Sequence, residues 1–145
     1  MQKVVIDTNV LVSSLIQRSY PYLIVNQLFI GGAFSLCISD EVMAEYYEVL
    51  ERPKFAKFQD FFIRAESLLV EIEEKSTKYF PTITLQLISD DDDNMILELA
   101  DECEADYVIT GNSNDFTFPY YKNTKIVTPK EYWDNHKPLG FSVLF

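Results

Sequence analysis

Acidic side chains at four distant places in the chain are the residues best suited to chemistry, namely Asp7, Glu45, Asp93 and Asp115. Where several carboxylates meet inside a protein, burial and mutual repulsion raise their pKa values. Mg²⁺ and Mn²⁺, which prefer oxygen ligands, remove that cost. One or two such ions can deprotonate a water molecule and stabilise the attacking and leaving oxygens at phosphorus. If the four acids converge, the sequence predicts a metal centre that acts on phosphate esters.

Glu45 lies at the edge of the buried face of a predicted helix. This helix is capped by Ser39 or Asp40 and runs to about Glu51. Glu45 falls beside its apolar stripe, which consists of Val42, Tyr46, Val49 and Leu50. An inward carboxylate is costly unless it is paired or metal-bound. A salt bridge to an Arg or Lys from elsewhere is the alternative to a metal-ligand role.

Asp93 begins the apolar stripe of another predicted helix, which covers Asp91–Glu104 and which Asp90 can cap. The stripe continues at helical spacing with Ile96, Leu97 and Ala100. The acids next to Asp93 have a simpler explanation, because carboxylates in a first helical turn complement the helix dipole. An EF-hand loop is excluded, since Met95 stands at its required glycine and Asp101 at its final glutamate.

Asp7 and Asp115 lie beyond the ends of predicted strands. Asp7 directly follows the apolar run Lys3–Ile6, and its alternative role is to cap the next helix. Asp115 lies beyond the strand Tyr107–Thr110, where it either reaches back over the sheet edge or belongs to a simple polar loop. Polar side chains near the acids are candidates for a supporting role, namely Asn9, Asp90, Thr110 and Asn112.

The elements that position these acids alternate between strands and helices, which indicates a parallel sheet covered on both faces. The carboxyl ends of parallel strands form ligand sites, so we expect the acids to meet at one edge of this sheet. The remaining predicted elements are helices at Tyr20–Ile30, Phe61 to about Lys75 and Thr128–Trp133, and strands at Phe34–Ile38 and Lys125–Val127. The last helix opens with a capping box, because Thr128 is followed three residues later by Glu131.

The chain is strongly acidic, with 12 Lys and Arg against 23 Asp and Glu and a formal net charge of −11. A generic nucleic-acid binder is basic, so a nucleic acid would have to be held by a local basic patch and by metal. The same acidity suits a protein that binds a basic partner. The length of 145 residues fits one domain, 1–145.

Several other classes of protein are excluded or disfavoured. His136 is the only histidine, which excludes a ribonuclease with two catalytic histidines, and the glycine-rich motifs of nucleotide-binding proteins do not occur. No stretch approaches the roughly 20 apolar residues of a membrane span, and no signal peptide is evident. Cys37 and Cys103 lie in apolar sequence and are expected to pack in the core, so a reducing cytoplasm is the simplest location. An aspartyl-phosphate phosphotransferase is disfavoured because Asn9 stands where its second Asp is needed.

Four blocks of the sequence, in order and spacing, resemble the PIN-domain family. They run from about residue 3 to 133 and read VVIDTNVLVSSL, SDEVMAEYYEVLERPKF, DDDDNMILELADECEADYVITGN, and NDF followed by TPKEYW. Their order and spacing are similar to those in the branch of the family described as toxins of toxin–antitoxin pairs. The resemblance implies a three-layer α/β/α sandwich with a central parallel sheet of about four to five strands. It also implies an endoribonuclease that depends on one or two Mg²⁺ or Mn²⁺ ions, with RNA as substrate and an antitoxin as partner.

By this resemblance the metal ligands are Asp7, Glu45 and Asp93, with Asp115 as the fourth. Two positions depart from the family pattern. Asp91 stands where the family often has proline, and Asn112 stands where many members have an acid. A catalytically weak or inactive scaffold that acts by binding another protein is therefore the alternative function.

Two further segments are candidates for contacts with other molecules. Arg52, Lys54 and Lys57, interleaved with two phenylalanines, are the best candidates for contacts with an RNA backbone. The alternative is a solvated loop whose aromatic rings pack in the core. The apolar tail at 137–145 is expected to form an edge strand or to pair with a second subunit or an antitoxin. A homodimer or a higher oligomer is expected.

Overall fold

The structure is a computed structural model that describes residues 1–112 and 114–141. Its centre is a sheet with the strand order β3-β2-β1-β4-β6-β5. The strands are β1 (Lys3–Ile6), β2 (Ser35–Ile38), β3 (Thr77–Lys78), β4 (Tyr107–Ile109), β5 (Tyr120–Tyr121) and β6 (Thr124–Val127). All neighbours pair in parallel except β5 and β6, which are antiparallel. The apolar run of β1 therefore lies at the middle of the sheet, where both faces are buried.

Helices connect most of the strands. They are α1 (Thr8–Ile16), α2 (Tyr20–Leu23), α3 (Asp40–Leu50), α4 (Phe61–Lys75), α5 (Asp91–Cys103) and α6 (Pro129–His136), with the π-helical turn η1 (Ile24–Phe29) and the 3₁₀ turn η2 (Pro53–Lys57). Ser39 caps α3 by accepting a hydrogen bond from the Val42 N–H, as predicted. The capping box at Thr128 and Glu131 opens α6, which is also as predicted.

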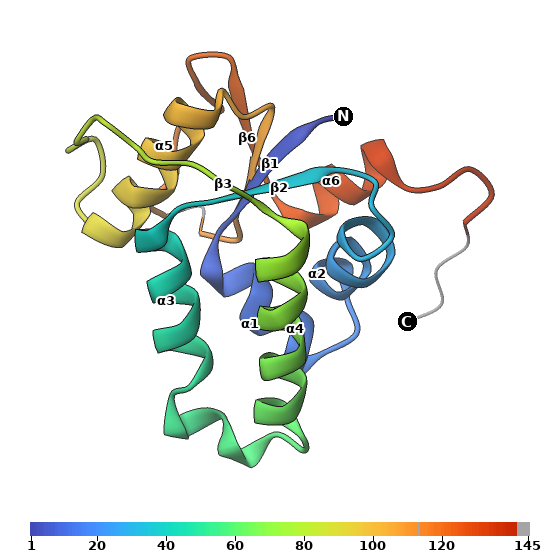
Figure 1. The fold of residues 1–145 in the computed structure, drawn as a ribbon. Coiled ribbons are helices and arrows are strands. Elements are labelled where there is room, and N and C mark those ends of the chain that lie inside the picture. The colour runs from blue at the N-terminus through green and yellow to red at the C-terminus, as the bar shows by residue number, and fades with distance from the viewer. Residues whose placement is uncertain (113, 142–145) are drawn as a thin grey trace.

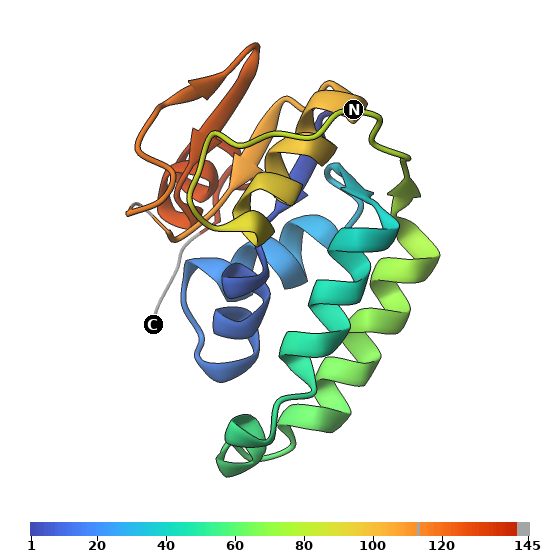
Figure 2. The ribbon, with the colours of Figure 1, turned by 90° about the vertical axis from the view of Figure 1, so that its left-hand side faces the viewer.

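The elements form the three layers of an α/β/α sandwich. Figure 1 shows α5 on one side of the strands and α2 and α6 on the other. In the rotated view of Figure 2, α5 lies in front of the strands, and α3 and α4 extend away from the sheet side by side. The buried faces of the helices and the strands share one hydrophobic core. The chain between α3 and α4 turns back through η2. This arrangement confirms the predicted fold class.

The structure adds two short strands that the sequence did not indicate. Both β3 and β5 contain two residues, and they lie at the two ends of the sheet order. Of the tail, the described residues 137–141 form no strand, and Phe141 instead packs edge-on against Trp133 at a ring distance of 5.1 Å. Residues 142–145 lie outside the described chain. No helix in the described ranges is long and apolar enough to span a bilayer.

Candidate metal centre

Three carboxylates lie together at the start of α5. Asp90, Asp93 and Asp115 each offer an oxygen atom, and these atoms lie within 4.8 Å of one another. Asp90 and Asp93 come from the N-terminus of α5, and Asp115 comes from the loop after β4. The predicted inward position of Asp93 is observed, since its side chain is buried. Asp90, expected only to support the site, is part of this group.

Asn94 holds the chain that enters α5 in place. This buried side chain accepts hydrogen bonds from the backbone N–H groups of Leu87 and Ile88 and donates one to the Ile88 carbonyl at 2.6 Å. Asp90 in turn caps the helix by accepting from the Asp92 N–H at 2.8 Å. These bonds fix the direction from which Asp90 and Asp93 approach the end of the sheet.

Asp7 ends β1 and lies buried at the same edge of the sheet. Its backbone N–H donates to the Ile109 carbonyl of the neighbouring strand β4. Its carboxylate accepts a hydrogen bond from the Thr110 hydroxyl at 2.7 Å and another from the Asn9 amide at 3.2 Å. Asp7 occupies the N-cap position of α1, but within the described chain its side chain makes no capping hydrogen bond to that helix.

Thr110 and Asn112 connect Asp7 to the group at α5. The Thr110 hydroxyl accepts a hydrogen bond from the Asn112 backbone N–H at 3.0 Å while it donates to Asp7. The Asn112 side-chain amide then donates to Asp115 at 2.9 Å and to Asp93 at 3.3 Å. The polar residues predicted to support the site thus join three of the four predicted acids into one hydrogen-bonded network.

Glu45 is half-buried on α3 and is held by a residue that sequence reasoning missed. The Thr8 hydroxyl donates to the Glu45 carboxylate at 2.7 Å. Among the described residues Glu45 forms no ion pair, so the salt-bridge alternative is not observed. The sequence did carry a signal for Thr8, since it lies at helical spacing from the buried Leu11 and Leu15 and must face the same way.

The electrostatics of the site oppose the ionisation of all four acids together. Burial is the main reason that the pKa of Asp7 is raised and that of Glu45 is raised to about 7. The pKa of Asp93 is raised by burial first and then by its hydrogen bond with Asp115, while that same bond lowers the pKa of Asp115. Each of these three raised values also includes repulsion from other acids at the site. A bound cation would relieve this repulsion.

The donor set fits Mg²⁺ or Mn²⁺. All the groups that converge here offer oxygen, which suits hard divalent cations better than the soft metals bound by cysteine. The closest group consists of Asp90, Asp93 and Asp115, whereas Asp7 and Glu45 join it through hydrogen bonds and electrostatic interactions. The exact ligand set stays a prediction.

The predicted substrate-binding residues lie at the end of α3 and in η2. Arg52 forms an ion pair with Glu48 at 2.7 Å, and Lys54 and Lys57 each lie over a phenylalanine ring. Both rings pack toward the core, as the alternative interpretation expected. Longer-range electrostatic interactions also link the Arg52 guanidinium to Glu45 and Asp92.

Comparison with known proteins identifies the family. No curated protein and no solved structure matches the chain. A family model described as the PIN domain matches residues 3–114, which is more than half of the chain and includes every element that carries Asp7, Glu45 and Asp93. The chain therefore belongs to the PIN-domain family, whose members are typically nucleases.

Proposed function

We propose that this protein is a divalent-metal-dependent endoribonuclease that hydrolyses RNA phosphodiester bonds. The observation that carries the proposal is the convergence of carboxylate oxygens from Asp90, Asp93 and Asp115 within 4.8 Å, beside the buried Asp7. Acids placed this way are costly to keep ionised without a cation. Family membership supports nuclease chemistry at this site.

In this proposal the acids have distinct tasks. Asp90, Asp93 and Asp115 hold the cation, with Asp7 and Glu45 as the further ligands or as acceptors for bound water. Mg²⁺ or Mn²⁺, when bound, supplies a Lewis acid that activates water and stabilises negative charge on the phosphate. Thr110 and Asn112 orient the carboxylates through the hydrogen bonds described above.

The substrate would be oriented by cations at the border of the acidic site. Among the three candidates, Arg52 is the one whose charge interacts at longer range with Glu45 and Asp92. Lys54 and Lys57 are exposed in the adjacent turn η2 and can contact further phosphates. A few local cations of this kind are consistent with a protein whose formal net charge is −11.

We further propose that the protein is the toxin of a toxin–antitoxin pair and works in the cytoplasm as a homodimer or higher oligomer. The support is the resemblance of its motif spacing to that branch of the family. Co-expression tests this proposal: the protein alone should stop growth, and a neighbouring gene product should restore it. Growth arrest that persists in the Asp93→Asn variant would contradict it.

Cleavage of single-stranded RNA tests the enzymatic proposal directly. Purified protein should cleave with Mn²⁺ or Mg²⁺ and stop when a chelator is added. Asp93→Asn and Asp7→Asn should abolish cleavage while leaving the fold intact, as judged by circular dichroism. Asp134 lies on α6 and does not belong to the acidic group, so Asp134→Asn serves as the matched control and should cleave normally. Wild-type rates in either site variant would refute the assignment.

A non-catalytic scaffold is the second candidate function, and one observation favours it. The Asn112 amide already donates to Asp93 and Asp115, so these two carboxylates are partly neutralised without a metal. A titration with Mn²⁺ separates the two candidates. A nuclease should show a rise in melting temperature with Mn²⁺ that Asp93→Asn removes, whereas an idle scaffold should show none.

A further inference from the structure

A groove of about 530 Å³ lies between α3 and α4, away from the acidic centre. Tyr47 of α3 and Glu51, which directly follows α3, form one wall, and Phe62, Glu66 and Val70 of α4 form the other. A second hollow continues from it across the outer face of α4 and shares its Glu66 and Val70 walls. The two hollows thus form one continuous surface along the helix pair.

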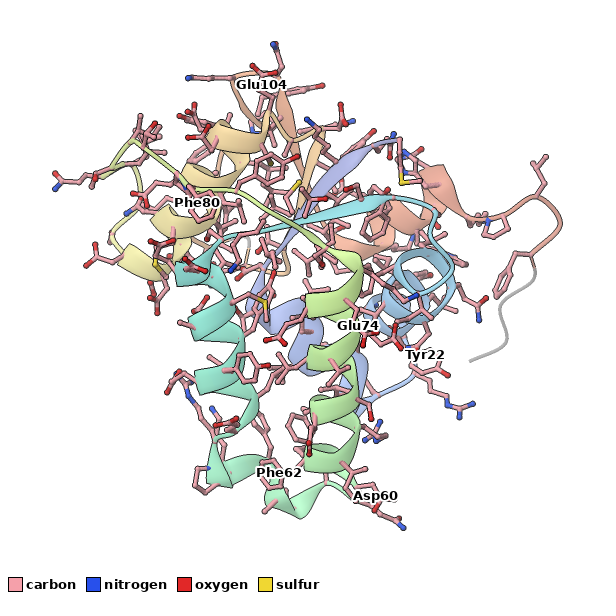
Figure 3. All side chains as sticks on the ribbon, viewed as in Figure 1. Tyr22, Asp60, Phe62, Glu74, Phe80 and Glu104 are labelled. Atoms are coloured by element: carbon pink, nitrogen blue, oxygen red, sulfur yellow. The ribbon has the colours of Figure 1, made fainter. Side chains whose placement is uncertain are left out.

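This surface exposes apolar side chains that the core does not need. Phe62 is 40% exposed, Val70 is 47% exposed and Ile63, on the second hollow, is 69% exposed. Phe62 and Val70 are two helical turns apart, so they lie on one face of α4. Figure 3 shows Phe62 between the ends of α3 and α4. Contiguous exposed apolar side chains with a polar border are typical of interaction sites.

The border of the groove is acidic. The Tyr47 hydroxyl donates to the Glu73 carboxylate at 2.6 Å. This hydrogen bond is the main reason that the pKa of Tyr47 is raised, and the nearby charges of Glu51 and Glu66 raise it further. Across residues 1–112 and 114–141, no ion pair joins these three glutamates to a lysine or arginine. Among the described residues these carboxylates are therefore free of salt bridges and can pair with cations of another molecule.

We propose that this groove binds an amphipathic helix of a partner protein, with apolar side chains on its contact face and lysine or arginine on both flanks. The apolar row would contact Phe62 and Val70, and the flanking cations would pair with Glu51, Glu66 and Glu73. The stretch of α4 from Phe62 to Glu73 is about 17 Å long, which matches about three turns of a docked helix.

Charge distinguishes this occupant from two others. An RNA strand would bring phosphates close to the three glutamates of the border, and repulsion between like charges disfavours that contact. A second copy of this chain would bring another protein with a formal net charge of −11 and the same acidic border. Only a basic amphipathic helix gains both from apolar contacts with Phe62 and Val70 and from pairing with the glutamates.

Two synthetic peptides of about 14 residues test the proposal with the full-length protein. Both carry leucine on one helical face, and the flanks carry lysine and arginine in one peptide and glutamate in the other. Fluorescence anisotropy should detect binding of the basic peptide, weakened by salt, and none of the acidic peptide. Absence of binding by the basic peptide, or equal binding of both, overturns the proposal.

Substitutions then locate the binding surface. Phe62→Ser with Val70→Ser should weaken binding of the basic peptide by at least about tenfold. Phe80→Ser with Leu87→Ser makes the same change at exposed apolar residues elsewhere and should leave binding unchanged. Figure 3 shows Phe80 at the opposite end of the helix pair from Phe62. Equal loss in both double variants, or in neither, contradicts the assignment of the groove.

Charge reversal provides an independent measurement. Glu51→Lys with Glu66→Lys should also weaken binding about tenfold, whereas Glu41→Lys with Glu104→Lys, an equal change in net charge at other exposed sites, should not. Sedimentation of the free protein completes the test. A dimer that the Phe62→Ser and Val70→Ser changes dissociate would assign the groove to a second copy and refute the proposal. Direct binding of RNA to the free protein, lost with the Phe62→Ser and Val70→Ser changes, would also refute it.

Discussion

Replacement of Thr110 by valine should destabilise the folded protein mainly through the buried carboxylate of Asp7. Valine keeps the shape of the side chain but removes the hydroxyl that donates to Asp7 at 2.7 Å and accepts from the Asn112 backbone N–H at 3.0 Å. Asp7 then keeps only the longer hydrogen bond from Asn9 among its side-chain partners within the described chain. A hydrogen bond to a charged group contributes about 1.5–3 kcal/mol, so near neutral pH the free energy of unfolding should fall by about that amount.

The loss should grow as pH rises, because the Thr110 hydrogen bond favours the ionised form of Asp7. Burial raises the pKa of folded Asp7 above its ordinary value of 3.8, and the Thr110 hydrogen bond is the main effect that opposes the rise. The variant raises this pKa further. Stability from such a group is fully present below the unfolded pKa and is lost as pH rises through the folded pKa. The difference between variant and wild type should therefore be small near pH 4 and full near pH 7.5.

Urea unfolding at both pH values, in the presence of a chelator, measures this difference. Trp133 is the only tryptophan and is buried in α6, so its fluorescence reports global unfolding. Thr110→Ser keeps the hydroxyl and should behave like wild type to within about 1 kcal/mol. An equal loss at both pH values, or a valine variant as stable as wild type near neutral pH, would refute the role given to this hydrogen bond.

Three further predictions concern the site and the core. Asn112→Asp should strengthen Mn²⁺ binding, measured by calorimetry, because it replaces an amide donor by a carboxylate between Asp93 and Asp115; unchanged affinity would contradict this. Metal affinity should rise from pH 6 to 8, because Glu45 and Asp93, whose pKa values are raised to about 7 and about 8, must lose their protons to bind; a flat profile would exclude Glu45 as a ligand. Thr8→Val should weaken Mn²⁺ binding, whereas Thr8→Ser should bind like wild type, because the hydroxyl orients Glu45. Equal affinities of the valine variant and wild type would contradict this role of Thr8.

The sequence predicted the elements that follow local rules. The capping box of α6 and the cap of α3 depend on residues three positions apart, and both occur as expected. The inward position of Asp93 followed from helical periodicity alone, and the structure confirms it. The parallel sheet followed from the alternation of strands and helices. These features are predictable because each depends on contacts close in the chain.

Features that depend on distant contacts were not predictable. Thr8 and Glu45 are far apart in the sequence, and only the packing of α1 beside α3 brings the hydroxyl to the carboxylate. Asp90 follows the cap rule, yet its place beside Asp93 and Asp115 depends on the loop after β4. The groove is lined by residues of both α3 and α4, so the residue pattern of either helix alone does not predict it.

The two short outer strands affect how this protein meets other molecules. A long unpaired strand at a sheet border invites another chain to extend the sheet, which leads to fibres and misassembly. Here β3 and β5 have two residues each, Pro81 follows the first and Pro119 precedes the second, and the Lys78 side chain of β3 forms an ion pair with Asp40. Such borders offer too few free backbone groups to template growth. Association should therefore proceed through helix surfaces, which keeps concentrated solutions of the folded protein free of β-rich polymers.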